Sequence, residues 1–348
     1  MSSNNGYHVA IVGATGAVGE HLIRTLEERD FPIRRLTFMA SKRSSGKKMQ
    51  FKGEEIPIVE AKGELFKNVD IAFFSAGGSV SKALAPEAVK HGTVVIDNTS
   101  AFRMEPNVPL VVPEVNEEDL KNHNGIIANP NCSTIQMVVS LEPIRKKYGL
   151  KRVLVSTYQA VSGAGNRAVD ELYMQSKEIM EGKKPEANIL PVKNDPKHYP
   201  IAFNAIPQID VFQDNGFTFE EMKMINETRK IMHMPDLKVG ATCVRIPVVR
   251  GHSESVYFEV EKPNVTPNQI RSVLAEAPGV ILQDRPSEQI YPLPLDSVNR
   301  REVFVGRIRK DLDDEYGFHM WVVSDNLLKG AAWNSIQIAE SLQKLNLI

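Results

Sequence analysis

The sequence contains little cysteine: only Cys132 and Cys243 among its 348 residues carry a thiol. Since one disulfide would add little to a core of this size, we expect a reduced, cytoplasmic protein. No apolar stretch is long enough to cross a bilayer, so we expect no membrane segment. The formal net charge is −1, and without a basic excess we expect no nucleic-acid partner. Repeats and low-complexity tracts are also missing.

The length and the hydrophobic pattern predict two domains, because the chain exceeds the size at which one core stops growing. Short apolar runs and helical segments such as 83–90 alternate in the first part, which is typical of a mostly parallel, helix-covered sheet. The expected strands are 9–12, 36–40, 69–74, 94–96, 110–112 and 126–128. After a helix over 135–148, the longer runs 153–159 and 256–260 indicate a second, α+β domain.

Two further segments complete this organisation. Residues 182–213 show no steady period, which predicts a long surface excursion or an arm to a partner subunit. Residues 327–345 space their apolar side chains for one helical face, after Asp325-Asn326 as a cap. We expect this closing helix to return to the first domain and to bring Asn326 near the cofactor.

A glycine-rich turn follows the first expected strand: Gly13-Ala14-Thr15-Gly16-Ala17-Val18-Gly19. Glycines permit a tight turn and let the backbone approach a pyrophosphate, which the next helix then holds at its N-terminus. The alternative is a purely structural turn. Because the turn lies between a strand and a helix, the sequence favours a dinucleotide site.

The segment Ala40-Ser41-Lys42-Arg43-Ser44-Ser45 follows the second expected strand. An NAD enzyme usually offers an acidic side chain to the ribose at this position. Cations without an acid favour a 2′-phosphate and therefore NADP. The alternative is a solvated basic loop, since surface Lys and Arg are common.

Cys132 stands in Asn129-Pro130-Asn131-Cys132-Ser133-Thr134, just before an apolar helical segment. A thiol at a helix start feels the aligned backbone dipoles, which stabilise the thiolate. The alternative is a small buried hydrophobic side chain, the usual state of a free cysteine. Cys243 lies in a strand-like stretch where packing is the better interpretation, so we predict Cys132 as the nucleophile.

A thiolate that attacks an acyl carbon needs a proton shuttle, and His252, at a strand entrance in Arg250-Gly251-His252, is the candidate. Arg103 and Arg245 can each bind a carboxylate or phosphate through a planar fork of donors. Glu220 and Lys223 share one face if they lie on a helix. For each of these residues the alternative is a structural role, such as a surface salt bridge.

These residues together resemble the aspartate-semialdehyde dehydrogenase family over nearly the whole chain. The similarity runs through 13–19, 41–44, 100–103, 129–134, 158–165, 219–223, 245–252 and 324–331. The resemblance implies an α/β protein with a Rossmann-like NADP-binding domain at 1–130. It further implies an α+β catalytic and dimerisation domain at 131–326 and a C-terminal helix, 327–348, that packs on the first domain. A homodimer or a dimer of dimers is implied as well.

The resemblance also implies roles for individual residues. Cys132 would be the acyl-thioester nucleophile, His252 the acid/base, and Gln159 the group that orients the bound acyl group. Arg103, Asn131 and Lys223 would hold phosphate, Arg245 the substrate α-carboxylate and Glu220 its α-ammonium. NADP would be lined by Gly13, Thr15, Gly16, Ala17, Val18, Ser41, Arg43, Ser44, Ser162, Gly163 and Asn326. No metal is implied.

The implied reaction is the NADPH-dependent reductive dephosphorylation of L-aspartyl 4-phosphate to aspartate 4-semialdehyde, in lysine, diaminopimelate, methionine and threonine biosynthesis. An alternative is N-acetyl-glutamyl-phosphate reductase. The amine of its substrate is acylated, so Glu220 would have no cation to bind. Its nucleophile motif also usually places Gly before the cysteine, where this chain has Asn131. Glyceraldehyde-3-phosphate dehydrogenase is a more distant analogue. From another class, a non-catalytic NADP-binding redox sensor would keep the glycine turn without the chemistry.

Overall fold

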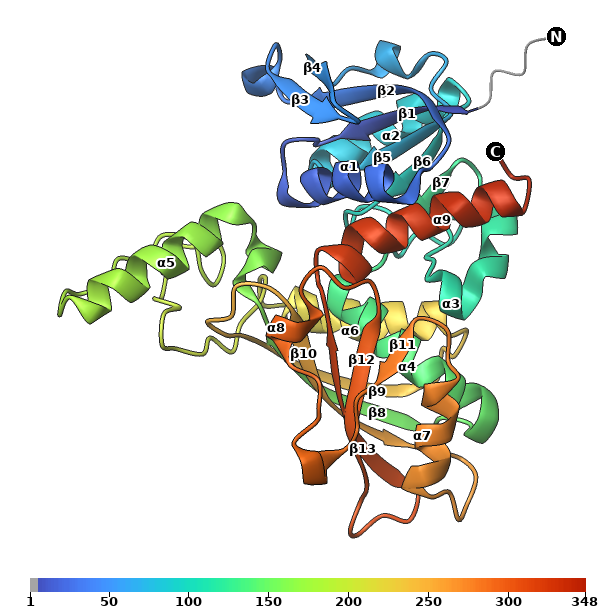
Figure 1. Cartoon of the computed structure of the whole chain (residues 1–348), viewed down its shortest axis with the longest axis vertical. Coiled ribbons are helices and arrows are strands. Elements are labelled where there is room, and N and C mark those ends of the chain that lie inside the picture. The colour runs from blue at the N-terminus through green and yellow to red at the C-terminus, as the bar shows by residue number, and fades with distance from the viewer. Residues whose placement is uncertain (1–5) are drawn as a thin grey trace. The chain divides into compact units, whose positions relative to one another are not determined.

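The computed structural model describes residues 6–348, which divide into two compact units (Figure 1). The first unit contains the chain up to Asn131 together with Ala331–Ile348, and the second contains Cys132–Gly330. No helix within residues 6–348 is long and apolar enough to cross a membrane.

The first unit is built on a seven-stranded sheet in the order β3-β4-β2-β1-β5-β6-β7. All neighbours pair in parallel except β3 and β4, which are antiparallel. The strands are β1 Tyr7–Val12, β2 Ile33–Ala40, β3 Lys48–Phe51, β4 Glu54–Glu60, β5 Ile71–Phe74, β6 Val94–Asp97 and β7 Ile126–Ala128. The helices are α1 Ala17–Arg29, α2 Gly78–Lys90 and α3 Pro113–Asn116, joined by α9 Trp333–Lys344 from the C-terminal end.

Each face of this sheet carries its own apolar cluster. On one face, Leu22 and Leu26 of α1 pack in the same cluster as Ile336 and Leu342 of α9. On the other face, Ala85 of α2 packs with the strand residues whose side chains point to that side of the sheet. Strands buried on both faces have near-continuous apolar sequences, which is why they could be recognised as short hydrophobic runs.

Most of the expected elements of the first unit are confirmed. Residues 110–112 are the exception, because only Leu110 forms a bridge, to Ala128, before α3 begins. The β3–β4 hairpin was not predicted, since β4 is half-exposed and its sequence mixes Glu with Ile, Pro and Val. The expected return of the C-terminal helix is confirmed: α9 packs against α1, α3 and β6.

The second unit contains a six-stranded mixed sheet in the order β11-β12-β13-β10-β8-β9. One face is covered by the helices α4, α6 and α7. The strands are β8 Arg152–Gln159, β9 Lys238–Arg245, β10 His252–Glu259, β11 Val280–Leu282, β12 Val303–Lys310 and β13 Gly317–Ser324. The helices are α4 Cys132–Tyr148, α5 Asn166–Met180, α6 Phe219–Ile231, α7 Pro267–Ala275 and α8 Pro294–Ser297. The predicted α+β character of this part is therefore confirmed.

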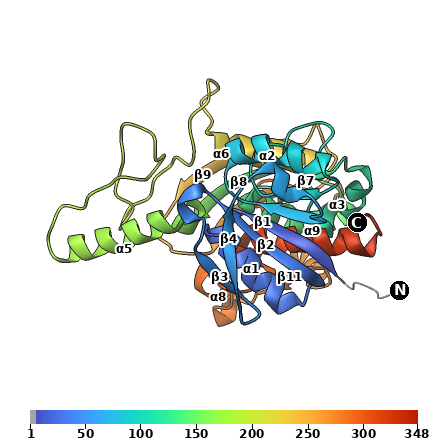
Figure 2. The same ribbon diagram turned by 90° about the horizontal axis from the view of Figure 1, so that it is seen from above.

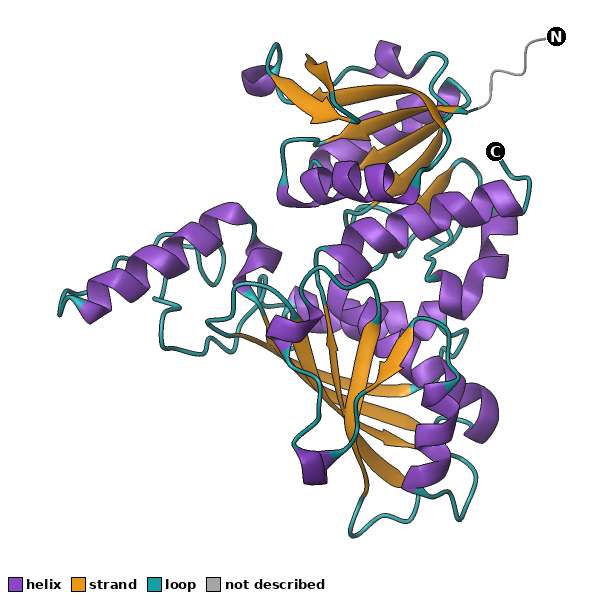
Figure 3. Cartoon of the chain, viewed as in Figure 1, coloured by secondary structure: helices purple, strands orange, loops and turns teal. Residues whose placement is uncertain are grey.

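The opposite face of the second sheet is open in the single chain. Along β8, buried and exposed residues alternate, and the side chains of Leu154 and Tyr158 are 46% and 37% exposed. Helix α5, which was not predicted, and the segment after it extend away from this sheet (Figure 2). Between α5 and α6 the described chain forms no helix or strand, which confirms the long excursion expected over 182–213 (Figure 3).

Candidate active site

The glycine turn of the first unit has a geometry that only glycine satisfies at two positions. Gly13 has φ +94°, and a Cβ there would lie 2.8 Å from the backbone nitrogen of Ala76. A Cβ on Gly19 would lie 2.3 Å from the carbonyl oxygen of Gly13. Thr15 and Gly16 are exposed directly before α1, while Ala17 and Val18 are half-buried in its first turn. The turn therefore presents open backbone at a helix N-terminus.

The basic segment after β2 lies beside this turn in the first unit. The backbone N–H of Gly13 donates to the carbonyl oxygen of Met39 at 2.8 Å, which joins the ends of β1 and β2. The chain then forms a 3₁₀ turn over Lys42–Ser44, in which Ser44 is buried and Arg43 is exposed. Ser41 is exposed directly before it. A ligand group bound beside the glycine turn could thus be met by the exposed guanidinium of Arg43.

Arg103 is buried in the first unit against the segment that leads to Cys132. Its Nε donates to the carbonyl oxygen of Asn129 at 2.9 Å, and one terminal nitrogen donates to that of Asn98 at 2.8 Å. The Asn129 side chain accepts a hydrogen bond from Asn334 of α9 at 2.8 Å. Asn131, also buried, is the last residue of this segment. Asn334 was not predicted as a site residue, because nothing local in the sequence distinguishes an amide on a helix face.

In the second unit, strand register brings three predicted residues to one edge of the sheet. Gln159 pairs with Arg245 at the carboxyl ends of the parallel strands β8 and β9. Since β10 runs antiparallel to β8, with Ser253 opposite Tyr158, its first residue, His252, reaches the same edge. We call Gln159, Arg245 and His252 the strand-end cluster.

His252 is completely buried, and its ring is held by the backbone: Nδ1 accepts a hydrogen bond from the N–H of Ala160 at 3.0 Å. This bond assigns the proton of the neutral ring to Nε2. Nε2 has no hydrogen-bond partner among the described residues, and a Cβ on Gly163 would lie 3.4 Å from it. Burial, with Arg245 adding to it, lowers the pKa of His252 to about 3, so the imidazole is neutral at physiological pH.

Arg245 lies beside this histidine and is also buried. One terminal nitrogen donates to the carbonyl oxygen of Ala160 at 2.8 Å, whereas Nε has no partner among residues 6–348. Burial lowers the pKa of Arg245, and Glu220, then Cys132, oppose that shift. A guanidinium normally stays charged in proteins. A buried cation with an unused donor is suited to receive an anionic ligand group.

Glu220 and Lys223 lie on the first turns of α6, as the predicted shared helix face requires. Glu220 is buried, and its two oxygens are divided between partners: Gln159 Nε2 at 3.2 Å and Lys223 Nζ at 3.2 Å. Lys223 Nζ also contacts the carboxylate of Asp210 at 2.9 Å. Glu220 is thereby connected to the strand-end cluster through Gln159.

The two cysteines occupy different environments, as predicted. Cys132 is the first residue of α4 and is partly exposed. Cys243 is fully buried on β9, where burial raises the pKa of the thiol and Sγ lies 3.7 Å from the sulfur of Met224. Of the two cysteines, Cys132 is the one that combines a helix start with partial exposure.

Asn326 and Ser162, both predicted to line the cofactor, are joined in the second unit. Asn326 Nδ2 donates to Ser162 Oγ at 3.0 Å, and Asn326 Oδ1 accepts from the N–H of Gly251, next to His252, at 3.0 Å. The neighbouring Asp325 forms a two-point ion pair with Arg250, at 2.9 and 2.6 Å. Asp325 was predicted only as a cap, and it does accept hydrogen bonds from the following backbone N–H groups.

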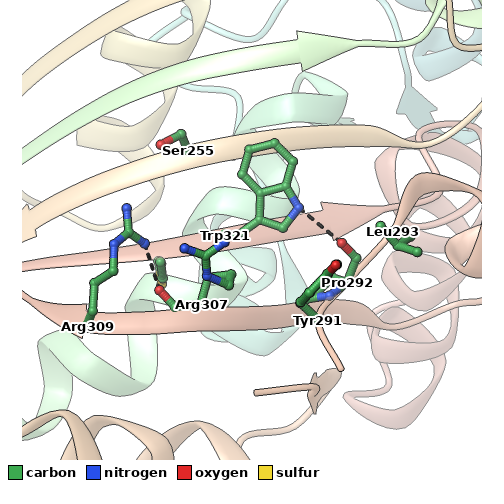
Figure 4. Close-up of a pocket in the computed structure, with 8 residues that line it drawn as sticks. Ser255, Tyr291, Pro292, Leu293, Arg307, Arg309 and Trp321 are labelled. Carbon is green, nitrogen blue, oxygen red and sulfur yellow. Dashed lines mark hydrogen bonds between the residues drawn. The ribbon is translucent and has the colours of Figure 1, made fainter. Parts of the chain in front are cut away.

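A separate hollow of about 290 Å³ lies on the open face of the second sheet (Figure 4). Arg307, Arg309 and Trp321 line it, and Trp321 Nε1 donates to the carbonyl oxygen of Pro292 at 3.1 Å. None of the predicted site residues lines this hollow.

Comparison with known proteins gives matches to two family models. Residues 8–123 match "Semialdehyde dehydrogenase, NAD binding domain", and residues 141–329 match "Semialdehyde dehydrogenase, dimerisation domain". The aspartate-semialdehyde dehydrogenase of Bacillus subtilis is 69% identical over 343 residues, covering 99% of each chain. That of Aquifex aeolicus is 58% identical and covers 99% of this chain and all of its own.

Solved structures agree with these matches. An aspartate semialdehyde dehydrogenase II from Vibrio cholerae, described as complexed with ASA, has a TM-score of 0.91 at 45% identity and covers 97% of this chain and 98% of its own. An aspartate semialdehyde dehydrogenase with NADP from Candida albicans has a TM-score of 0.75 at 27% identity, covering 99% and 100%. The glycine turn, the strand-end cluster and these full-length similarities lead to one conclusion: the chain belongs to the aspartate-semialdehyde dehydrogenase family.

Proposed function

We propose that the protein catalyses the NADPH-dependent reductive dephosphorylation of L-aspartyl 4-phosphate to L-aspartate 4-semialdehyde through a thioester on Cys132. The observation that carries this proposal is the strand-end cluster, in which a buried arginine with an unused donor lies beside a neutral histidine and an amide connected to Glu220. Together with Glu220, such a cluster offers opposite charges to a small amino acid and a hydrogen-bond donor, Nε2–H of His252, to its reacting oxygen.

Recognition of a free amino acid follows from the two buried charges. The guanidinium of Arg245 would bind the substrate α-carboxylate, since its planar fork matches two carboxylate oxygens. Glu220 would bind the α-ammonium, with Gln159 between the two charges helping to orient the acyl group. An N-acetylated substrate would offer no ammonium to the buried carboxylate of Glu220, which would keep the Lys223 ammonium at 3.2 Å as its cation. This argues for aspartyl phosphate over N-acetyl-glutamyl phosphate.

The covalent step uses Cys132. Its thiolate attacks the 4-carbonyl carbon, a C–S bond forms, and the bond between carbon and the phosphate oxygen breaks with its electron pair, releasing inorganic phosphate. Arg103, Asn131 and Lys223 would bind the phosphoryl group. Nε2–H of the neutral His252 would donate a hydrogen bond to the oxygen of the adduct as it becomes negative. When the reduced adduct collapses, the C=O bond re-forms, the C–S bond breaks, and the thiolate of Cys132 is released with the aldehyde.

The residues present in the first unit fit a dinucleotide. The Gly13–Gly19 turn has no room for side chains at two positions, and Ser41, Arg43 and Ser44 follow the neighbouring strand. The open backbone of Thr15–Val18 would hold the pyrophosphate and Arg43 the 2′-phosphate, with Ser162, Gly163 and Asn326 binding the nicotinamide end. When bound, NADPH supplies the hydride that reduces the thioester.

We also infer a homodimer. The open face of the second sheet exposes Leu154 and Tyr158, and the hollow lined by Trp321 lies on the same face. The family model that matches this part describes a dimerisation domain. A second copy would cover this apolar surface, and a dimer of dimers is the larger alternative.

The free state of both cysteines supports a cytoplasmic location, where the product would serve lysine, diaminopimelate, methionine and threonine biosynthesis.

The reverse reaction tests the proposal. Purified protein is mixed with aspartate semialdehyde, phosphate and NADP⁺, and NADPH absorbance is followed, with N-acetylglutamate semialdehyde and NAD⁺ in matched reactions. We expect phosphate-dependent NADPH formation with aspartate semialdehyde alone. Turnover of the N-acetylated aldehyde would favour the alternative reductase. Binding of NADP⁺ without turnover of either aldehyde would indicate a redox sensor.

A further inference from the structure

Gly330 lies directly against the predicted nucleophile, inside the second unit. A Cβ placed on Gly330 would lie 2.6 Å from Cys132 Cβ and 3.2 Å from Cys132 Cα. Carbon atoms that pack without repulsion are about 3.5–4.0 Å apart. The missing side chain of Gly330 therefore leaves the space that the first residue of α4 occupies.

Gly330 is not free to move away from this contact. It belongs to a π-helical turn over Leu328–Ala332, a rare geometry that occurs often at functional sites. Its backbone N–H donates to the carbonyl oxygen of Asp325, five residues earlier, at 3.2 Å. Asp325 is itself fixed, because its buried carboxylate pairs with Arg250 and accepts hydrogen bonds from the N–H groups of Leu327 and Leu328.

We propose that Gly330 is a positioning residue for Cys132: the anchored turn that begins at Asp325 supports the Cα and Cβ atoms of the nucleophile, and only glycine allows the required distance. The inference rests on the proposed role of Cys132 as nucleophile and adds the residue that determines its location. A methyl group at Gly330 would have to separate the two carbons by about 1 Å to restore ordinary contact. The added methyl group would therefore move the start of α4 and the anchored turn apart, which changes the location of Cys132 relative to that turn.

The contact is tested first without reference to activity, by a double-mutant cycle on the melting temperature. Gly330→Ala is made in the natural chain and in a Cys132→Gly background, where the 2.6 Å contact no longer exists. The preference of helices for alanine over glycine acts equally in both backgrounds, so it cancels from the comparison. We expect Gly330→Ala to lower the Tm more in the natural chain than in the Cys132→Gly background.

Equal changes in Tm in the two backgrounds would overturn the inference, whatever the activity of the variants. If Gly330→Ala fails to fold in the natural chain, recovery of soluble protein in the Cys132→Gly background supports the contact, and failure in both overturns it. The cycle does not depend on catalysis. It therefore remains valid even if Cys132→Ala proves active and the proposed function fails.

Kinetics then test the positioning role. A displacement of about 1 Å can reduce turnover by about 10²-fold, so we expect Gly330→Ala to lower kcat by that order. KM for aspartate semialdehyde should change little, because Arg245 and Glu220 are untouched. A kcat within twofold of the natural enzyme, in a preparation where Cys132→Ala is inactive, would overturn this inference and leave the proposed function intact.

Discussion

The glycine turn of the first unit and the strand-end cluster of the second are built in opposite ways. The turn uses seven consecutive residues, is partly exposed, and acts through backbone and missing side chains. The cluster uses buried side chains from three strands that are far apart in the sequence and meet through register. The turn depends on the absence of side chains at its glycines, and the cluster depends on side-chain groups that are buried.

This difference determines how each region responds to substitution. Burial lowers the pKa of His252 to about 3 and keeps the ring neutral, so the environment of the cluster determines the protonation state of its members. The turn is partly exposed and its basic neighbour Arg43 is exposed, and the role proposed for both is to bind the cofactor. Changes in the cluster should therefore alter turnover, whereas changes around the turn should alter affinity for the cofactor.

The largest effect is expected for Cys132, the proposed nucleophile that begins α4. Cys132→Ala removes the thiolate and should reduce turnover by roughly 10⁴-fold or more, as for other covalent catalysts. Cys243→Ala is the matched control, because it removes the buried thiol of β9. It should keep activity within a few-fold in the NADPH absorbance assay. A Cys132→Ala protein with normal turnover would refute the covalent scheme.

The next effect is expected at His252. His252→Asn keeps a polar side chain but removes the Nε2–H donor that faces the adduct oxygen in the proposed mechanism, so kcat should fall by about 10²–10³-fold with little change in KM. Since the pKa of His252 is lowered to about 3, the ring stays neutral between pH 5 and 8. The kcat/KM profile of the natural enzyme should therefore show no inflection near 6.5. An inflection there that disappears in His252→Asn would contradict the buried, neutral state.

A smaller and more selective effect is expected beside the glycine turn. Arg43→Glu replaces an exposed cation by an anion and should raise KM for NADPH by roughly tenfold, since one charge-assisted contact to the 2′-phosphate is lost. NADH lacks that phosphate, so its KM should stay within about twofold. Lys48→Glu, an exposed change on β3, is a control for general surface charge. Equal changes for NADPH and NADH would contradict the NADP assignment.

The glycine turn could be predicted from the sequence because the residues that specify it are consecutive. A strand, seven consecutive residues and a helix start already specify the geometry, and the helix start at Cys132 was predicted for the same reason. The strands of the first unit were also recognisable, because burial on both faces makes them continuously apolar. Half-exposed β4 had no such pattern, and it was missed.

The strand-end cluster could not be assembled from local pattern alone. Gln159, Arg245 and His252 were named as candidates, but their meeting depends on the β8–β9 and β8–β10 registers, and a shift of one residue would turn every side chain to the other face. Gly330 and the Asp325–Arg250 pair were missed as site features for a similar reason. Their importance lies in a contact with Cys132 and in an anchored turn, and neither has a sequence signature.

The smallest expected effect concerns the core directly beside the cluster. Glu254, two residues after His252 on β10, is fully buried, and burial raises the pKa of its carboxyl well above the ordinary value, which Gln136 partly opposes. The folded state therefore keeps a proton that the unfolded chain releases above about pH 4.5, so this group lowers stability progressively as pH rises above that value. Glu254→Gln cannot ionise, and its Tm relative to the natural protein should rise by a few degrees between pH 5 and 8. Glu118→Gln, at an exposed position, should show no such trend in the same melting series. If the Glu254→Gln difference is constant with pH, Glu254 ionises inside the fold, and the buried region around His252 is more polar than its packing indicates.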